Sequence, residues 1–199
     1  MLLAVALQEY RRAIELEPSL AREALEGYFK FTQDYDQLKQ ILPQIPDAIY
    51  NLAIFLQDHN AWDQNKESFR KNMELAEDKS GYYKALSRGY YNCKDYQRAI
   101  STLQEYLKID PNDADIHFTL ADWAFYGPRD RDLAFKEVQI ALKLDPKNTF
   151  YRYWYCRWLG YTRNYENAIA ECEKILQLDP GNKKAKEWLE ECRKAQRTQ

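Results

Sequence analysis

The chain has 199 residues, with 29 lysines and arginines against 31 aspartates and glutamates, and a formal charge of -2. This balance offers no basic footprint for nucleic acid, and no apolar run approaches the roughly 18 residues needed to span a membrane. Aromatic residues make up 15% of the chain and there are 6 glycines. Such a composition favours tightly packed helices over sheet or disorder.

The segment 1–18 predicts a helix rather than a leader peptide. It lacks the basic leader and the cleavage site of a signal peptide, and it continues into helical spacing at Tyr10 and Ile14. Its apolar stripe also includes Leu3 and Leu7 and needs a covering partner. We therefore expect either that the chain is cut from a longer protein or that this helix associates with a second copy.

The segment 19–45 predicts an irregular unit. Pro43 and Pro46 remove backbone donors and force the residues before them out of helical geometry. A regular helical pattern returns in 46–79.

The stretch 80–113 carries the clearest pattern, because its apolar residues recur at spacings of three and four. Two helical stripes result, separated by residues 92–95 and closed by Pro111. The first stripe comprises Tyr83, Leu86, Tyr90 and Tyr91, and the second comprises Tyr96, Ala99, Ile100, Leu103, Tyr106 and Leu107. A lone hairpin of this size cannot bury both stripes, so it needs neighbours.

The neighbours are present, because the same skeleton returns at a step of about 34 residues. Ala99, Ala134 and Ala168 take the same place in three successive second helices. The chain thereby resembles the tetratricopeptide repeat, with its pattern W-x2-L-G-x2-Y, then A-x3-F, then P. In 80–113 the matching residues are Tyr83, Leu86, Ser87, Tyr90, Ala99, Leu103 and Pro111.

That resemblance implies an all-α fold, a right-handed α-α superhelix in which antiparallel helix hairpins form one continuous solenoid. The expected units are 1–18 (the second helix of a truncated repeat), 19–45 (a degenerate repeat), 46–79, 80–113, 114–148 and 149–182 (repeats), and 183–199 (a capping helix). The unit 114–148 is longer by one residue, which we assign to the turn between its helices.

The four cysteines do not indicate a metal or redox motif. They are Cys93, Cys156, Cys172 and Cys192, and the tight spacing that such motifs need is missing. Cys156 and Cys172 stand where small residues pack in the repeat, so we predict buried free thiols there. The compartment is left open: the cytoplasm is slightly favoured, and a soluble domain of a membrane protein is the alternative.

Catalytic chemistry is not indicated either. His117 is expected to pack against the neighbouring helix, and His59 lies in a predicted turn. Neither has a partner set by spacing, and there is no glycine-rich phosphate loop. We predict no enzymatic activity, no cofactor and no metal.

Protein binding is the function that the resemblance implies, because first helices of such repeats line a concave groove. Aromatic residues next to arginines are the types that dominate interface energetics. The predicted groove residues are Tyr50, Lys84, Arg88, Tyr91, Asn92, Phe118, Asp122, Tyr126, Tyr153, Trp154, Arg157 and Tyr161. For any single one of them, an ordinary solvated surface residue is the alternative.

Some members of the family hold a C-terminal carboxylate with a Lys-Asn-Asn-Lys-Arg clamp. Lys84 matches its first position, but the other four positions do not match. They hold Arg88, Thr119, Phe150 and Trp154. We therefore expect an extended or helical peptide with apolar anchors and some acidic character near Arg88 and Arg157.

These features predict a non-catalytic protein-interaction scaffold that takes a protein or peptide ligand. Two alternatives stay open. One is an accessory domain of a larger enzyme or membrane-associated assembly, for example the tail of a bacterial glycan polymerase or ligase. The other is self-association through the N-terminal helix.

Overall fold

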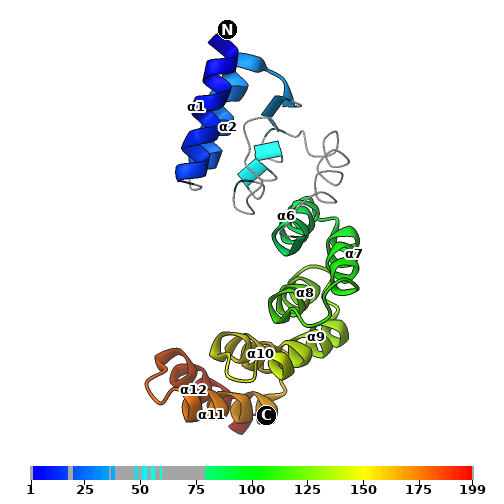
Figure 1. The fold of residues 1–199 in the computed structure, drawn as a ribbon. Helices are drawn as coiled ribbons and strands as arrows, with labels where there is room; N and C mark the ends of the chain where they lie inside the picture. Colours follow the sequence, from blue (N-terminus) through cyan, green and yellow to red (C-terminus); the bar gives the residue numbers. More distant parts are fainter. Residues whose placement is uncertain are drawn as a thin grey trace. The chain divides into compact units, whose positions relative to one another are not determined.

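The computed structural model describes residues 2–17, 20–35, 37–38, 48, 51–52, 55–56, 59 and 79–198. Within these residues the chain forms helices and turns and no strand (Figure 1), which confirms the all-α class. The predicted unit 19–45 is described in its first part, through residue 38, whereas most of the predicted unit 46–79 lies outside the described residues. The chain divides into two compact units, residues 1–109 and 110–199.

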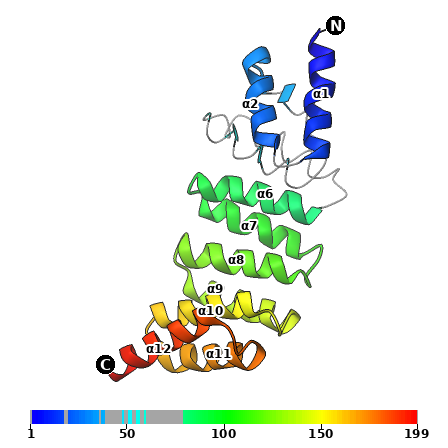
Figure 2. The same cartoon turned by 90° about the vertical axis from the view of Figure 1, so that its left-hand side faces the viewer.

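The first unit begins with a pair of packed helices, α1 (Leu2–Leu16) and α2 (Ala21–Thr32), which lie side by side in Figure 2. The Tyr10 ring lies 5.8 Å from the Tyr28 ring, edge to face. Gly27 permits this approach, because a Cβ there would lie 2.7 Å from the Tyr10 hydroxyl oxygen. A larger residue at this position would have to displace the Tyr10 ring.

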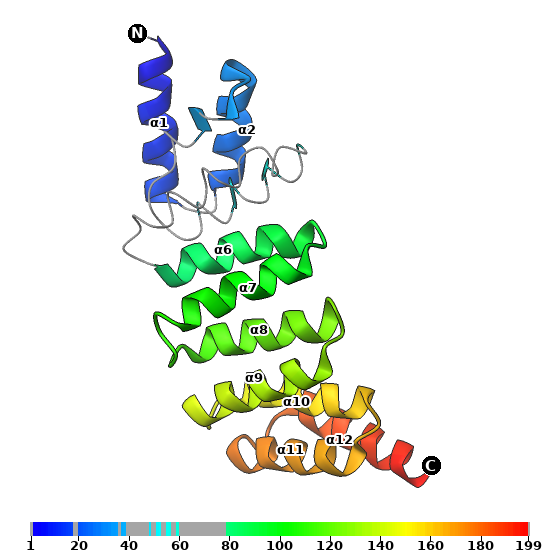
Figure 3. The same cartoon turned by 90° about the vertical axis from the view of Figure 1, so that its right-hand side faces the viewer.

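A regular hairpin follows, built from α6 (Lys79–Asn92) and α7 (Tyr96–Leu107) (Figure 3). Both predicted stripes contribute to its core. Its buried residues include Leu86, Ser87 and Tyr90 on α6, and Ala99, Leu103 and Tyr106 on α7. Ala99 is fully buried, as its place in the repeat pattern predicts.

The second unit contains five helices in the described residues 110–198. They are α8 (Ala114–Tyr126), α9 (Arg131–Leu144), α10 (Thr149–Tyr161), α11 (Tyr165–Leu178) and α12 (Lys183–Arg197). α8 packs against α9, α10 against α11, and α11 against α12 (Figure 1). None of the described helices is both long and apolar enough to cross a membrane.

Side chains placed just before the helices fix where several of them start. Each of these capping residues accepts a hydrogen bond from the backbone N–H three positions later, which satisfies a donor that the first helical turn leaves open. The capping residues are Asp95, Asp113, Asp130, Asn148 and Asn182.

The turns inside the three C-terminal hairpins share one backbone geometry. A basic residue with positive φ stands directly before the N-cap of the second helix: Lys94 (φ 62°), Arg129 (φ 62°) and Arg163 (φ 64°). The N-cap N–H then donates to a carbonyl near the end of the first helix, from Asp95 to Tyr90, Asp130 to Ala124 and Asn164 to Leu159, each at 2.9 Å. The α8–α9 turn accommodates the extra residue that the sequence indicates without disturbing this bond.

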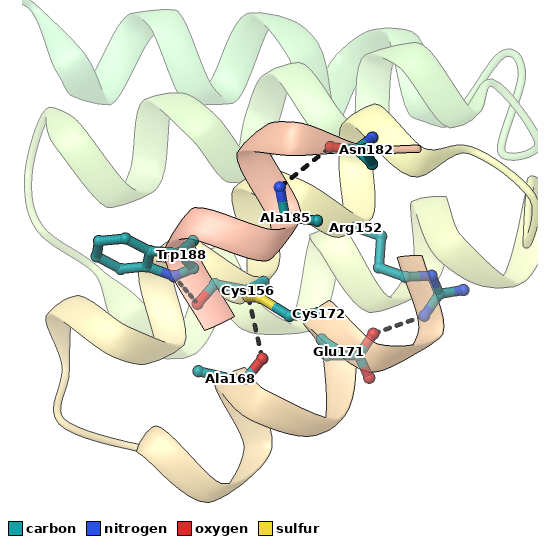
Figure 4. Close-up of a disulfide and its surroundings, with 8 residues drawn as sticks. All are labelled: Arg152, Cys156, Ala168, Glu171, Cys172, Asn182, Ala185 and Trp188. Atoms are coloured by element: carbon teal, nitrogen blue, oxygen red, sulfur yellow. Dashed lines mark hydrogen bonds and ion pairs between the residues drawn. A yellow bond between two sulfur atoms is a disulfide. The ribbon is translucent and has the colours of Figure 1, made fainter. Parts of the chain in front are cut away.

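A disulfide joins Cys156 of α10 to Cys172 of α11, and both residues are fully buried (Figure 4). The prediction of burial is confirmed, but the prediction of free thiols is wrong. Their Cα atoms are 6.1 Å apart, within the range that a disulfide bridges. The spacing of the cysteines along the sequence argues against a metal motif, but it does not predict the distance between Cys156 and Cys172 across the hairpin.

α12 closes onto α10 at a second point of close approach. A Cβ at Gly160 would lie 2.8 Å from the Trp188 ring. The Trp188 indole N–H donates to the Cys156 carbonyl at 3.4 Å (Figure 4). Cys192 of α12 is buried beside them, and burial, with a contribution from the charge of Glu191, raises the pKa of its thiol to about 11. This thiol therefore stays protonated and unreactive near neutral pH.

The substitution Ala99→Leu tests the packing inside the α6–α7 hairpin. Because Ala99 is fully buried, the added methylenes must displace neighbouring atoms, and we expect a loss of about 1–3 kcal/mol in the free energy of unfolding. Urea denaturation measures it. Gln104→Leu on the exposed side of the same helix is the matched control, with an expected change within about 0.5 kcal/mol. Equal stability of the two variants would contradict the packing.

Reduction of the Cys156–Cys172 disulfide is expected to destabilise the chain. The bond closes a loop with a sequence separation of 16 residues, and a loop of about that length contributes roughly 3 kcal/mol by limiting the unfolded chain. Unfolding curves with and without reductant measure the difference, and Cys172→Ala should not respond to the reductant. Four free thiols in the unreduced, unfolded chain would rule the bond out.

Candidate functional site

The predicted groove residues of the first unit lie on α6, apart from Tyr50, which is outside the described part of the chain. Arg88 and Asn92 are exposed, whereas Lys84 and Tyr91 are half-buried. The Tyr91 ring rests against another aromatic ring of the same hairpin. The four residues therefore differ in exposure, and Arg88 and Asn92 present more of their surface than Lys84 and Tyr91 do.

The predicted groove residues of the second unit lie on two helices, α8 and α10, and most of them are brought together. Ring contacts join the helices, with centroids 5.3 Å apart between Phe118 and Phe150 and 6.4 Å apart between Tyr126 and Trp154. We use the term aromatic surface for Phe118, Tyr126, Phe150, Tyr153, Trp154, Arg157 and Tyr161. Asp122 is half-buried on α8.

The aromatic residues of α8 and α10 divide between this surface and the core beneath it. Trp158 is fully buried and stacks on Phe125 at 5.1 Å and on Phe118 at 5.9 Å. Phe118 is therefore partly a core residue, and less of it is open to a partner than the sequence suggests. Phe150, with 57% of its surface exposed, lies on the open side.

Arg157 occupies the centre of the α10 part of the surface. Its guanidinium carbon lies 5.9 Å from the ring centre of Tyr153, 5.4 Å from Trp154, 5.1 Å from Tyr161 and 5.2 Å from Trp188. Its Nη2 donates to the Tyr161 hydroxyl, and its Nε is buried without an acceptor. Four aromatic faces thus hold a positive charge in place by cation–π attraction.

A hydrogen bond between Tyr151 and Asp115 ties α10 to α8 below the surface. The Tyr151 hydroxyl donates to the Asp115 carboxylate. Burial raises the pKa of Tyr151, and the bond to Asp115 and nearby carboxylate charges raise it further. The tyrosine therefore stays protonated and keeps donating across the physiological pH range.

Two hollows open at the edges of the aromatic surface. One, of about 200 Å³, is lined by Phe125, Tyr126, Arg129, Arg131 and Tyr161. The other, of about 450 Å³, lies between α10 and α12 and is lined by Gly160, Tyr161, Arg163, Tyr165, Trp188, Glu191, Cys192 and Ala195. The sequence interpretation missed the two arginines of the first hollow, because it considered only the first helices. Basic residues recur at 94, 129 and 163, in the turn of each hairpin, and this recurrence is the sequence signal that could have indicated the turns as candidate sites.

His117 packs inside its hairpin, where both of its ring nitrogens are engaged. Nδ1 lies 2.6 Å from a Glu137 carboxylate oxygen and Nε2 lies 3.0 Å from the Pro111 carbonyl oxygen. Both ring nitrogens are therefore taken up by contacts within the protein. His117 is 7% exposed and Glu137 6%. The pair joins α8 to α9 and offers no open nitrogen to a substrate.

Within the described residues, no group of three or more histidine, cysteine, aspartate or glutamate side chains is arranged to hold a metal ion. His59 lies in a turn, as expected. Its ring stacks on Phe55 with centroids 4.0 Å apart, and its Nδ1 lies 2.9 Å from the Phe55 carbonyl oxygen. The contacts of this histidine are thus those of a packed side chain.

Comparison with known proteins identifies one repeat by sequence. Residues 82–113 match the model of the tetratricopeptide repeat, which falls inside the unit predicted at 80–113. A search of curated proteins returns no significant match.

Solved structures with a similar fold cover much more of the chain. The thermophilic TPR protein TTC0263 of Thermus thermophilus is 17% identical, with a TM-score of 0.59 over 94% of this chain and 98% of its own. MamA from Desulfovibrio magneticus, from residue 41 to its end, is 16% identical, with a TM-score of 0.59 over 91% and 97%. The first TPR of Spaghetti (RPAP3), bound to the HSP90 peptide SRMEEVD, is 20% identical, with a TM-score of 0.51 over 57% and 89%. These likenesses establish the fold as an all-α solenoid of helical repeats, as predicted.

The buried His117–Glu137 pair gives a test of the second unit's packing. His117→Ala leaves a carboxylate buried without its partner, and we expect a loss of about 3–5 kcal/mol in the free energy of unfolding. The double variant His117→Phe/Glu137→Leu removes both buried polar groups and fills the space, so it should lose clearly less. Denaturant unfolding of the three proteins measures this order. A double variant less stable than His117→Ala would contradict the mutual dependence of His117 and Glu137.

Proposed function

Because residues 82–113 form a tetratricopeptide repeat and the chain is an all-α solenoid of helical repeats, we propose that it is a non-catalytic protein-interaction scaffold. It binds a peptide segment of a partner protein, extended or helical, on the aromatic surface of α8 and α10. Of the compared proteins, the first TPR of Spaghetti is bound to a peptide, which supports this class of ligand.

The observation that carries the proposal is the exposure of large rings on one surface. Phe150, Tyr161 and Tyr126 have 57%, 45% and 44% of their surfaces exposed. Aromatic side chains bury much apolar area while losing few rotatable bonds, so they are effective anchors in interfaces. The exposed rings lie around Trp154 and Arg157, which the neighbouring rings hold in place. A partner therefore meets a surface that is largely formed before binding.

The surface fits an apolar side chain with acidic residues near it. The rings supply apolar contact area, and Arg157 supplies a positive charge with no carboxylate partner in the described part of the chain. An arginine in such a position discriminates against basic partners and favours acidic ones. Peptides with an aromatic or long aliphatic residue followed or preceded by aspartate or glutamate meet both requirements.

Selection from a random peptide library on the 199-residue chain tests the proposal. We expect the selected peptides to share an aromatic or long aliphatic residue. The variant Phe150→Ala/Trp154→Ala should bind such a peptide at least about 2 kcal/mol more weakly, because central aromatic anchors contribute at that level. Isothermal titration calorimetry measures the difference.

The matched control removes two exposed apolar side chains from elsewhere in the same unit. Leu144 and Leu178 stand at the ends of α9 and α11 and are 37% and 46% exposed, so Leu144→Ala/Leu178→Ala should bind as the unmodified chain does. Failure to select any peptide, or equal weakening in both variants, would overturn the proposed function.

A further inference from the structure

The hollow of about 200 Å³ at the α8–α9 turn differs from the aromatic surface in its chemistry. Besides Phe125, its lining consists of Tyr126, Arg129, Arg131 and Tyr161. All four of these side chains carry hydrogen-bond donors, and the lining contains no carboxylate. A small space bounded by donors alone favours an anionic group.

The two arginines have their charges available. Neither forms an ion pair with any residue in the described part of the chain. The intervening Asp130 is engaged elsewhere, because its Oδ1 accepts the N–H of Leu133 at 3.0 Å and caps α9. Both guanidinium groups therefore keep their hydrogen-bonding capacity for an added ligand.

The backbone holds Arg129 in a fixed place. It has a φ of 62°, and the next residue, Asp130, donates its N–H to the Ala124 carbonyl at 2.9 Å. Arg131 is the first residue of α9, where the helix dipole adds to the attraction for an anion. A ligand therefore meets cations whose backbone positions are set in advance.

The two tyrosines add directed donors. The Tyr126 hydroxyl oxygen accepts a hydrogen bond from Trp158 Nε1 at 3.3 Å, and the Tyr161 hydroxyl oxygen accepts one from Arg157 Nη2. Since each oxygen is held from inside the protein as an acceptor, its own hydrogen is free to point toward the hollow. Both tyrosines are nearly half exposed and belong to the aromatic surface as well.

We infer that this hollow, called the arginine pocket below, binds the carboxylate of an aspartate or glutamate side chain in the partner peptide. The inference rests on the proposed function, because the peptide's apolar anchor lies on the aromatic surface while its acidic residue enters the pocket. Tyr126 and Tyr161 connect the two subsites. Because the two subsites are held at a fixed distance from each other, the apolar and the acidic residue of the peptide should also have a fixed spacing.

The test uses one selected peptide, amidated at its C-terminus so that the side chain is the only source of carboxylate at the position examined. Replacing its acidic residue by the matching amide should weaken binding to the unmodified chain by about tenfold, the scale of a lost charge-assisted contact. Arg129→Gln/Arg131→Gln should bind the acidic peptide clearly more weakly than the unmodified chain does, and should lose most of the tenfold difference between the two peptides. The general attraction of Arg157 for acidic peptides accounts for the remainder. Added salt should weaken only the acidic peptide's binding to the unmodified chain.

The charge-matched control is Lys94→Gln/Lys147→Gln. Both lysines are exposed turn residues, and Lys94 has the same positive φ as Arg129. This control should keep the full preference for the acidic peptide. Thermal melting checks that both double variants are folded.

The outcomes separate the two proposals. Peptides selected with an apolar anchor but no acidic preference would overturn the pocket and leave peptide binding on the aromatic surface intact. An acidic preference of undiminished size in Arg129→Gln/Arg131→Gln would do the same. A chain that selects no peptide would overturn the proposed function and the pocket together.

Discussion

Two helices of a hairpin lie close together only where the side chains between them are small, and this steric requirement governs the other features of the molecule. Ala99, Ala134 and Ala168 fill these places and are fully buried. At Gly160 the approach is so close that even a methyl group would meet the Trp188 ring. Once the backbones are this near, helical periodicity determines which large side chains enter the core and which remain at the surface.

The same geometry gives the second unit two different kinds of surface at one place. Its first helices carry more rings than the core accommodates, so Trp158 is buried while Phe150 stays exposed. The hairpin turns require a residue with positive φ before the N-cap, and in each described case that residue is basic. In the α8–α9 hairpin this combination puts cations beside rings. The proposed division into an apolar and an acidic subsite follows from packing and turn geometry acting together.

The sequence predicts the features that depend on helical periodicity. It does not predict the features that depend on which side chains meet across a hairpin. The burial of Ala99 follows from its register in the repeat. The bond between Cys156 and Cys172 does not, because it depends on the distance between two helices rather than on sequence spacing. Arg129 and Arg131 were missed because the family's groove positions lie on first helices, whereas these residues flank a turn.

The disulfide also affects how the α10–α11 hairpin unfolds and refolds. In repeat proteins each unit contacts only its neighbours, so regions of different stability open separately. The covalent bond lies within the α10–α11 hairpin, and melting those two helices leaves Cys156 and Cys172 joined. The entropy of closing that loop is then already lost, which favours this hairpin as the place where the helices re-form. We therefore expect the hairpin that carries Trp154 and Arg157 to re-form more readily with the bond intact than after its reduction.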